Sequence, residues 1–429
     1  MKSRQSRSAL RRWLTAGAVN EAGTLATLSV LPVVVYRATH DPFAVGVLSA
    51  LQAAPYLVLG LAAGQLADRT GRQRLMVVGL VLAAGVAAVQ AFGLATGPHL
   101  AVLYACALLT STVFVVTDAA HFGLVPDLLR PEELARGWGL AGSLGNAVEI
   151  FVPPLALSVL AVAGAAAVVG ADAVSYLVAA VLIARVVPVV SRPADTRGRG
   201  PAGPGWTAGV TFIRRHPTLR WLVLAGFFNS AGFGLVNALL VVYAADALGL
   251  TTAGPRLGVL LAAAAVGGAV AGLTFDRVYR GRRVRALTLV GTAGSALAVG
   301  LVAVTASFVA AVCLLIGYGG LLGLTISTGI TYRQEVAPDQ VRSRVMVVGR
   351  MVAWGGQPFG AAVGGLLARS AGVAAAYLLA AALFVAATAV ATRIPRGAGA
   401  GHPRRRLRIR GVGDIQVERL GSDHVVADD

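Results

Sequence analysis

Four carboxylates lie inside long apolar stretches of the sequence, at Glu21, Asp118, Glu149 and Asp172. A charge placed inside lipid costs at least a few kcal/mol, so an acid in such a stretch is by default a functional candidate. Counted from the arginine-rich end of its stretch at 1.5 Å per helical residue, Glu149 lies roughly 16 Å deep and Glu21 roughly 12 Å deep. A carboxyl at that depth could bind and release a proton, so these two are the first candidates for proton coupling.

The other two acids and one arginine have simpler alternatives. Asp118 lies near the arginine-rich end of its stretch, and Asp172 lies about two turns below the opposite surface. Either one could be hydrated or satisfied by a neighbouring helix, although both stay candidates for proton coupling. Arg350 lies six residues into its stretch. It could extend to the nearby membrane surface, or it could pair with one of the acids.

Amide side chains are spread over several of the same apolar stretches. A single amide there is most simply explained by a hydrogen bond between helices, worth typically about 0.6 kcal/mol. Taken as a set, and together with Arg350, they predict a moderately polar central cavity for a substrate. The amides are Asn20, Gln52, Asn146, Asn229, Asn237 and Gln357.

A short polar turn separates two of the apolar stretches and contains Gly64, Asp68, Arg69, Gly71 and Arg72. Arginines alone could simply mark which side of a membrane the turn occupies. That bias explains neither an acid nor glycines at fixed spacing. The turn is therefore interpreted as a hinge that closes between packed helices.

Two loop patterns recur in the second half of the chain. Asp276 and Arg277 repeat Asp68 and its arginine 208 positions later (276 minus 68). The Pro-Asp pair at Asp127 recurs at Asp339, 212 positions later (339 minus 127). Loops of a membrane protein could contain Pro, Asp and Arg by chance, but two patterns at nearly equal offsets favour a duplication.

The elements that must position these residues are membrane spans, because about 20 apolar residues cross a bilayer. Hydrophobic residues make up 56% of the sequence and charged residues only 13%, a composition that predicts an all-α polytopic membrane protein. Twelve spans are expected near 13–36, 43–66, 75–95, 100–121, 138–162, 165–189, 219–246, 254–275, 285–304, 307–331, 345–368 and 372–392.

The distribution of positive charge orients these spans. With both termini on one side, 32 of the 37 Lys and Arg residues fall on that side, and only Arg37, Arg256 and Arg369 fall in the opposite loops. Positive residues are retained in the cytoplasm, so both termini are expected there. The predicted division is a six-helix bundle over 1–190, a cytoplasmic linker over 191–218, a second six-helix bundle over 219–393, and a basic disordered tail over 394–429.

The turn from Gly64 to Arg72 resembles the loop between spans 2 and 3 of major facilitator superfamily transporters. The sequences around Phe212–Leu219 and Arg342–Met346 are similar to the group that includes enterobactin and macrolide exporters. The resemblance implies two pseudo-symmetric six-helix bundles and alternating access. It further implies export of an amphipathic drug, siderophore or secondary metabolite, with proton antiport as the expected coupling.

The same resemblance assigns the polar turn to a cytoplasmic gate. Asp68 would face the N-terminal end of span 11, and Arg72 would reach Asp127 at the end of span 4. In the second half, Asp276 and Asp339 would form a looser counterpart. Alternatives are a uniporter, an importer, or a non-transporting membrane scaffold or sensor with this fold.

Several other classes of function are disfavoured. The single lysine, Lys2, leaves no phosphate-binding or Schiff-base lysine in the body, and the six histidines show no metal-ligand spacing. The protein is therefore not expected to be an enzyme or to bind a metal or a cofactor. It is not expected to bind nucleic acid either, despite a net charge of +18. The expected partners are a small-molecule substrate, protons and membrane lipids, for a monomer in a bacterial inner membrane.

Overall fold

The computed structural model describes residues 2–97, 99–128, 131–186, 206–252, 254–279, 284–338, 341–396, 407–410 and 414–417. The first set of helices is α1 (Lys2–Thr39), α2 (Pro42–Arg69), α3 (Arg72–Thr96), α4 (Leu100–Leu128) and α5 (Pro131–Ala184). The second set is α6 (Trp206–Arg215), α7 (Leu219–Asp246), α8 (Pro255–Val278), α9 (Val284–Val304), α10 (Phe308–Val336), α11 (Arg342–Trp354), α12 (Gly356–Ala371) and α13 (Val373–Ala391).

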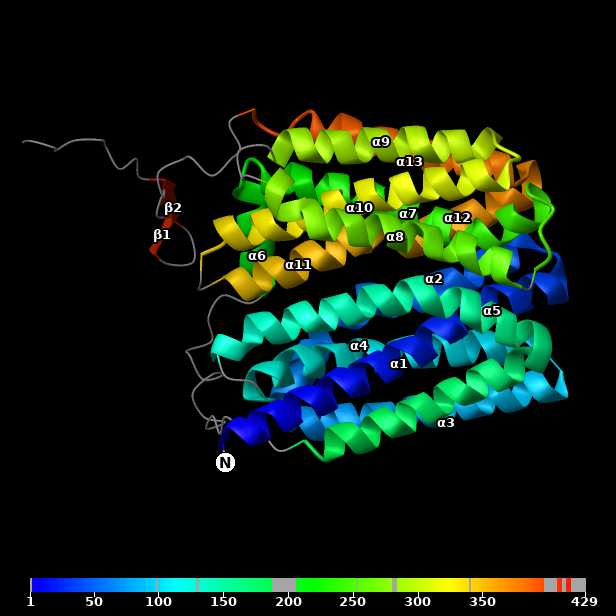
Figure 1. The fold of residues 1–429 in the computed structure, drawn as a ribbon. Coiled ribbons are helices and arrows are strands. Elements are labelled where there is room, and N and C mark those ends of the chain that lie inside the picture. The colour runs from blue at the N-terminus through cyan, green and yellow to red at the C-terminus, as the bar shows by residue number, and fades with distance from the viewer. Residues whose placement is uncertain are drawn as a thin grey trace, which may run out of the picture.

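These two sets form the two halves of the molecule, with α1–α5 below and α6–α13 above in Figure 1. Within the described residues, ten helices are long and apolar enough to cross a membrane. Helices suit such sequences because every backbone hydrogen bond is made within the segment, as lipid requires. The chain begins on the left in Figure 1, and this side of the molecule is the N-terminal side. The opposite side is the far side.

Helix α5 contains 54 residues but consists of two segments that run in opposite directions. Trp13 of α1 meets Trp138 of the first segment edge to face, while Arg12 donates to the backbone oxygen of Arg185, just after the end of the second. The chain reverses at Gly164, whose φ of 79° suits glycine because it has no Cβ. The reversal lies between the predicted spans 138–162 and 165–189.

Helices α11 and α12 occupy the predicted span 345–368 and are separated by a break at Gly355. Both run beside α7. A Cβ added to Gly360 would lie only 1.9 Å from the backbone oxygen of Ala231, so these helices touch backbone to backbone. This close approach needs small residues, and it fixes the direction in which Trp354 and Gln357 point.

The hydrophobic core joins the halves on one side only. On the far side a single cluster includes Val33–Tyr36 of α1, Ala238–Ala244 of α7, and Tyr318 of α10. On the N-terminal side each half has its own cluster, one around Trp13 and Tyr176 and the other built from α6, α7, α10 and α11. The halves are thus packed together at the far side and have separate cores at the N-terminal side.

Two short elements lie outside the long helices, namely helix α6 and a hairpin in the tail. Helix α6, inside the predicted linker, buries Phe212 and Ile213 and leaves Arg214 and Arg215 exposed. In the tail, where the sequence predicted no regular structure, β1 (Leu407–Arg410) pairs antiparallel with β2 (Asp414–Val417). Alternating apolar and polar residues such as Leu407, Arg408, Ile409 and Arg410 account for this hairpin.

Candidate functional site

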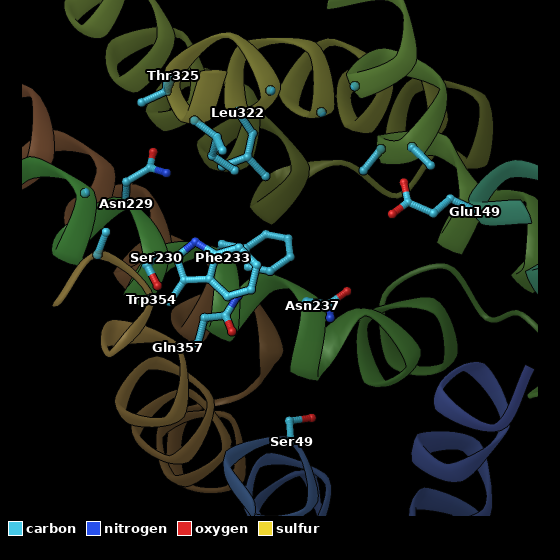
Figure 2. A pocket seen from close by; sticks show the side chains of 18 of the residues that line it. Ser49, Glu149, Asn229, Ser230, Phe233, Asn237, Leu322, Thr325, Trp354 and Gln357 are labelled. Carbon is cyan, nitrogen blue, oxygen red and sulfur yellow. The ribbon is translucent and has the colours of Figure 1, made fainter. Parts of the chain in front are cut away.

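A central cavity of about 530 Å³ lies between the two halves. The first half contributes residues of α1, α2 and α5, and the second contributes residues of α7, α8, α9, α10, α11 and α12. Most of the lining is apolar, with a few polar side chains, which is the usual composition of a small-molecule site. Figure 2 shows Glu149 of α5 across this cavity from Asn229 of α7.

Four of the predicted amides line this cavity, namely Gln52, Asn229, Asn237 and Gln357. Asn229 is only 4% exposed, and its Oδ1 has no hydrogen-bond partner within the described chain. Ser230 beside it is 8% exposed, and its hydroxyl is likewise unpartnered there. Buried polar groups are normally hydrogen-bonded, so these two atoms are available to a ligand.

A second cavity of about 410 Å³ lies on the first half. Three of the predicted acids, Glu21, Asp118 and Glu149, line it together with Asn20. Glu149 lines both cavities, and the charges of Glu21 and Glu149 lie close enough to interact. The structure therefore brings the two first candidates for proton coupling together beside the central cavity.

Asp118 and Arg350 form an ion pair between the halves, with 3.3 Å between Asp118 Oδ2 and Arg350 Nη2. The guanidinium of Arg350 also lies 4.8 Å from the ring centroid of Trp354 and 5.9 Å from that of Tyr56. Of the two roles considered for Arg350, the contacts agree with pairing. The pair connects the wall of the acid-lined cavity to the helix that bears Trp354.

The fourth acid, Asp172, lies elsewhere. It is 2% exposed and accepts hydrogen bonds from Thr27 at 2.7 Å and from Ser175 at 3.2 Å. It lies between α1 and α5 and lines neither cavity. The contacts agree with an acid satisfied by a neighbouring helix. Asn146, also predicted to face the substrate, is exposed on α5 and lines neither cavity either.

The predicted gate is only partly within the described structure. Asp339 lies outside the described residues, and so do the side chains of Gly64, Asp68, Arg69 and Asp127. Gly71 directly precedes α3, and Arg72 is its first residue. Asp276 and Arg277 are exposed in the last turn of α8. The gate assignment thus stays a prediction from the sequence.

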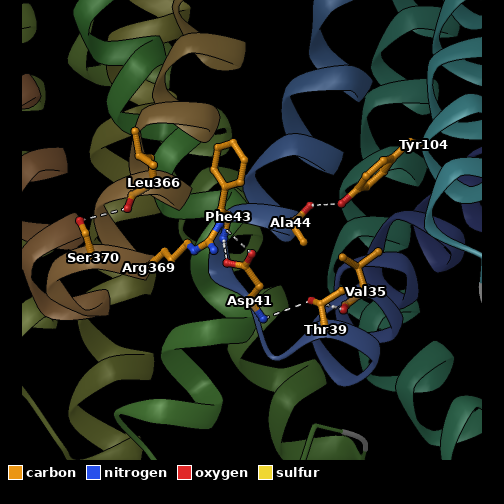
Figure 3. Close-up of polar contacts among 9 residues, drawn as sticks. All are labelled: Val35, Thr39, Asp41, Phe43, Ala44, Tyr104, Leu366, Arg369 and Ser370. Atoms are coloured by element: carbon orange, nitrogen blue, oxygen red, sulfur yellow. Dashed lines mark hydrogen bonds and ion pairs between the residues drawn. The ribbon is translucent and has the colours of Figure 1, made fainter.

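A different set of polar contacts joins the halves at the far side. Asp41, which precedes α2, forms an ion pair with Arg369 of α12 (Figure 3). The distance from Asp41 Oδ2 to Arg369 Nη1 is 3.5 Å. Arg37 Nε donates to Thr252 Oγ1 at 2.6 Å, and the Tyr36 hydroxyl donates to Asp246. In the sequence, Arg37 and Arg369 are visible only as rare positive charges in the loops of the far side. Their isolation there was the available signal for a pairing role.

Several lining residues were missed from the sequence. Trp354 and Phe233 place aromatic rings in the central cavity near Gln357 (Figure 2). Arg333 also lines it, because α10 continues to Val336 instead of ending near 331. An arginine counted as a loop residue is thus a cavity residue. Among the described residues, no group of three or more His, Cys, Asp or Glu could hold a metal ion.

His216 connects α6 to α7 by capping the second helix. Its Nδ1 accepts the backbone N–H groups of Thr218 at 3.3 Å and of Leu219 at 3.2 Å. Burial lowers the pKa of this imidazole to about 4. The neutral ring is the form that can accept at Nδ1, so burial and capping favour the same protonation state.

Comparison with known proteins agrees with this architecture. Enterobactin exporter EntS of Salmonella typhi is 26% identical over 360 residues, covering 81% of this chain and 82% of the exporter. EntS of Citrobacter koseri is 26% identical over 355 residues, with the same coverage.

Solved structures share the fold at low sequence identity. An inward-facing, occupied bacterial homologue of the human lysosomal transporter Spinster has a TM-score of 0.74 at 12% identity, covering 91% of this chain and 98% of its own. An inward-facing bacterial homologue of the iron transporter ferroportin has a TM-score of 0.69 at 17% identity, covering 90% and 98%. The family profile described as Major Facilitator Superfamily matches residues 13–356. The chain therefore belongs to the Major Facilitator Superfamily and is a transporter, not an enzyme.

Proposed function

We propose that the protein exports an amphipathic small molecule across a bacterial inner membrane by alternating access, in exchange for protons. The observation that supports this most strongly is the central cavity between the halves, whose apolar lining includes unpartnered amide and hydroxyl groups and one carboxylate, Glu149. Similarity to enterobactin exporters supports the outward direction.

The topology in this proposal has twelve crossings and cytoplasmic termini. The two antiparallel segments of α5 count as two crossings, and α11 with α12 counts as one. The 32-to-3 distribution of Lys and Arg makes the N-terminal side cytoplasmic. Because the hydrophobic core of the described residues joins the halves at the far side and is divided at the N-terminal side, this conformation would receive substrate from the cytoplasm.

In the transport cycle, the far-side contacts would break as the cytoplasmic side closes. Asp41–Arg369 would open, and Asp68, Gly71 and Arg72 would close onto span 11 and Asp127. Glu149, shared by both cavities, would release its proton when substrate binds and take up another after substrate leaves, and Glu21 would assist it. No cofactor beyond the proton gradient is invoked, and the protein would act as a monomer. The basic tail would contact anionic lipid headgroups.

The experiment uses everted membrane vesicles with an acidified lumen and a panel of antibiotics and siderophores. We expect at least one compound to trigger proton release from vesicles that contain the protein and not from vesicles that lack it. Substrate flux without proton release would instead indicate a uniporter. No flux of any compound in either direction would favour a scaffold or sensor.

A further inference from the structure

Arg333 places a positive charge in the wall of the central cavity. Its side chain is 8% exposed, and its Nε donates to the backbone oxygen of Gly329 at 2.9 Å. In the described part of the chain, no carboxylate lies within ion-pair distance of its guanidinium. Buried charges in proteins are normally paired, and the described residues leave this one available to an anionic ligand.

The surroundings of Arg333 form a slot for its guanidinium. A Cβ added to Gly349 of α11 would lie 2.6 Å from Arg333 Nη1, and one added to Gly329 would lie 3.9 Å from Nη2. Among the described residues, the charged group that acts on the Arg333 guanidinium is the like-charged Arg350, which pairs with Asp118. Among the described residues, the charges at this end of the cavity are two arginines and one aspartate, and their sum is positive.

The rest of the cavity offers two further kinds of contact. The rings of Trp354 and Phe233 lie beside Gln357 (Figure 2), and the Oδ1 of Asn229, which also lines the cavity, has no described donor. Arg333 lies level with Gly349, whereas Gly356 lies against Ala231, next to Ser230. These two levels are seven residues apart along α11 and α12, which corresponds to about 10 Å.

We propose that the cavity binds amphipathic aromatic anions, with the acid group at Arg333, the ring beside Trp354 and a hydrogen-bond donor at Asn229. This inference rests on the proposed transport function and specifies its substrate class. Glu149 would repel an acid group placed across the cavity, so the anion has one preferred orientation.

The test measures binding to the purified full-length protein by calorimetry. The probe is 6-hydroxy-2-naphthoate, whose carboxylate and hydroxyl stand at opposite ends of a rigid two-ring system. Its matched neutral analogue is 6-hydroxy-2-naphthamide. We expect the carboxylate to bind at least about tenfold more tightly, the difference typical of one hydrogen bond to a charged group. Equal binding of the two, or tighter binding of 2-naphthylmethylammonium, would overturn the proposal.

Variants assign the preference to residues. Arg333→Gln should remove the preference for the carboxylate, Arg333→Lys should retain most of it, and Arg393→Gln, at an exposed arginine beyond α13, should leave it unchanged. Asn229→Leu should weaken the binding of 6-hydroxy-2-naphthoate but not the binding of 2-naphthoate, which has no hydroxyl. An anion preference that survives in Arg333→Gln contradicts the assignment. If that variant does not fold, the comparison of carboxylate and carboxamide on the unmodified protein still decides.

This result is independent of the transport assay. An anion preference without any flux would leave the site intact and contradict the transport proposal. Flux without an anion preference would support the transport proposal and contradict the anion site.

Discussion

Asp118 of α4 and Arg350 of α11 are 232 positions apart in sequence and form a 3.3 Å ion pair between the two halves of the transporter. The cores of the halves are separate on that side of the molecule, so this pair is a polar contact in a region with little shared packing. A change in the separation of the halves would alter it directly.

Asp118→Asn should therefore slow turnover while leaving insertion and folding intact. The side chains are 22% and 41% exposed, so the coupling free energy should be about 1 kcal/mol or less. A double-mutant cycle with Arg350→Gln measures it through transport rates, with Arg393→Gln as the control. Strictly additive effects of the two substitutions would contradict a functional pair.

We expect the far-side contact between Asp41 and Arg369 to open in every transport cycle. In a background without Cys106 and Cys313, we expect a reducible cross-link between Asp41→Cys and Arg369→Cys to stop transport. Reductant should restore it, and each single cysteine variant treated with the same reagent is the control. Cross-linked protein that transports at the rate of the reduced protein would show that this contact does not open.

The His216 cap should make the stability of the protein depend on pH. The imidazole has a folded pKa of about 4, below its ordinary value near 6.5, so the unfolded chain binds the extra proton between these values. Stability from this group is complete above about pH 6.5 and falls as the pH decreases toward 4. Thermal unfolding should show this dependence, and His216→Asn, which can cap without titrating, should reduce it. An unchanged pH profile in that variant would exclude His216 as its source.

Asp68→Asn should leave membrane insertion intact but slow turnover, because the proposed gate needs a carboxylate facing a helix N-terminus. The neighbouring Arg74 should tolerate replacement by Lys, since either residue provides a positive charge on the cytoplasmic side. Initial transport rates at matched protein levels distinguish the two substitutions. Unimpaired transport by Asp68→Asn would remove it from the gate.

Much of the helical framework could be predicted because a membrane span has a simple requirement, about 20 apolar residues. The turn at Gly164 lies between two predicted spans, and α9 begins and ends within one residue of its prediction. Family membership was also confirmed, because it depends on short loop patterns that are visible in sequence.

The site was harder to predict, because helix rotation decides which side chains face the cavity. Asn229 and Asn146 look equivalent in sequence, yet Asn229 lines the central cavity and Asn146 does not. Asp172 stayed a candidate for proton coupling in the sequence, although a neighbouring helix was its simpler explanation, and Thr27 and Ser175 bind it inside the first half. Arg333 was missed because the end of α10 could not be located within a turn.

The most direct test of the account is transport by purified protein in proteoliposomes under an imposed pH gradient. The substrate is the compound that gives the largest proton release from everted vesicles, and Glu149→Gln is compared with the unmodified protein. We predict accumulation against the compound's own gradient, reversal when the pH gradient is reversed, and loss of this coupling in Glu149→Gln. Accumulation that ignores the sign of the pH gradient, or full coupling in Glu149→Gln, would contradict proton-coupled export through this cavity.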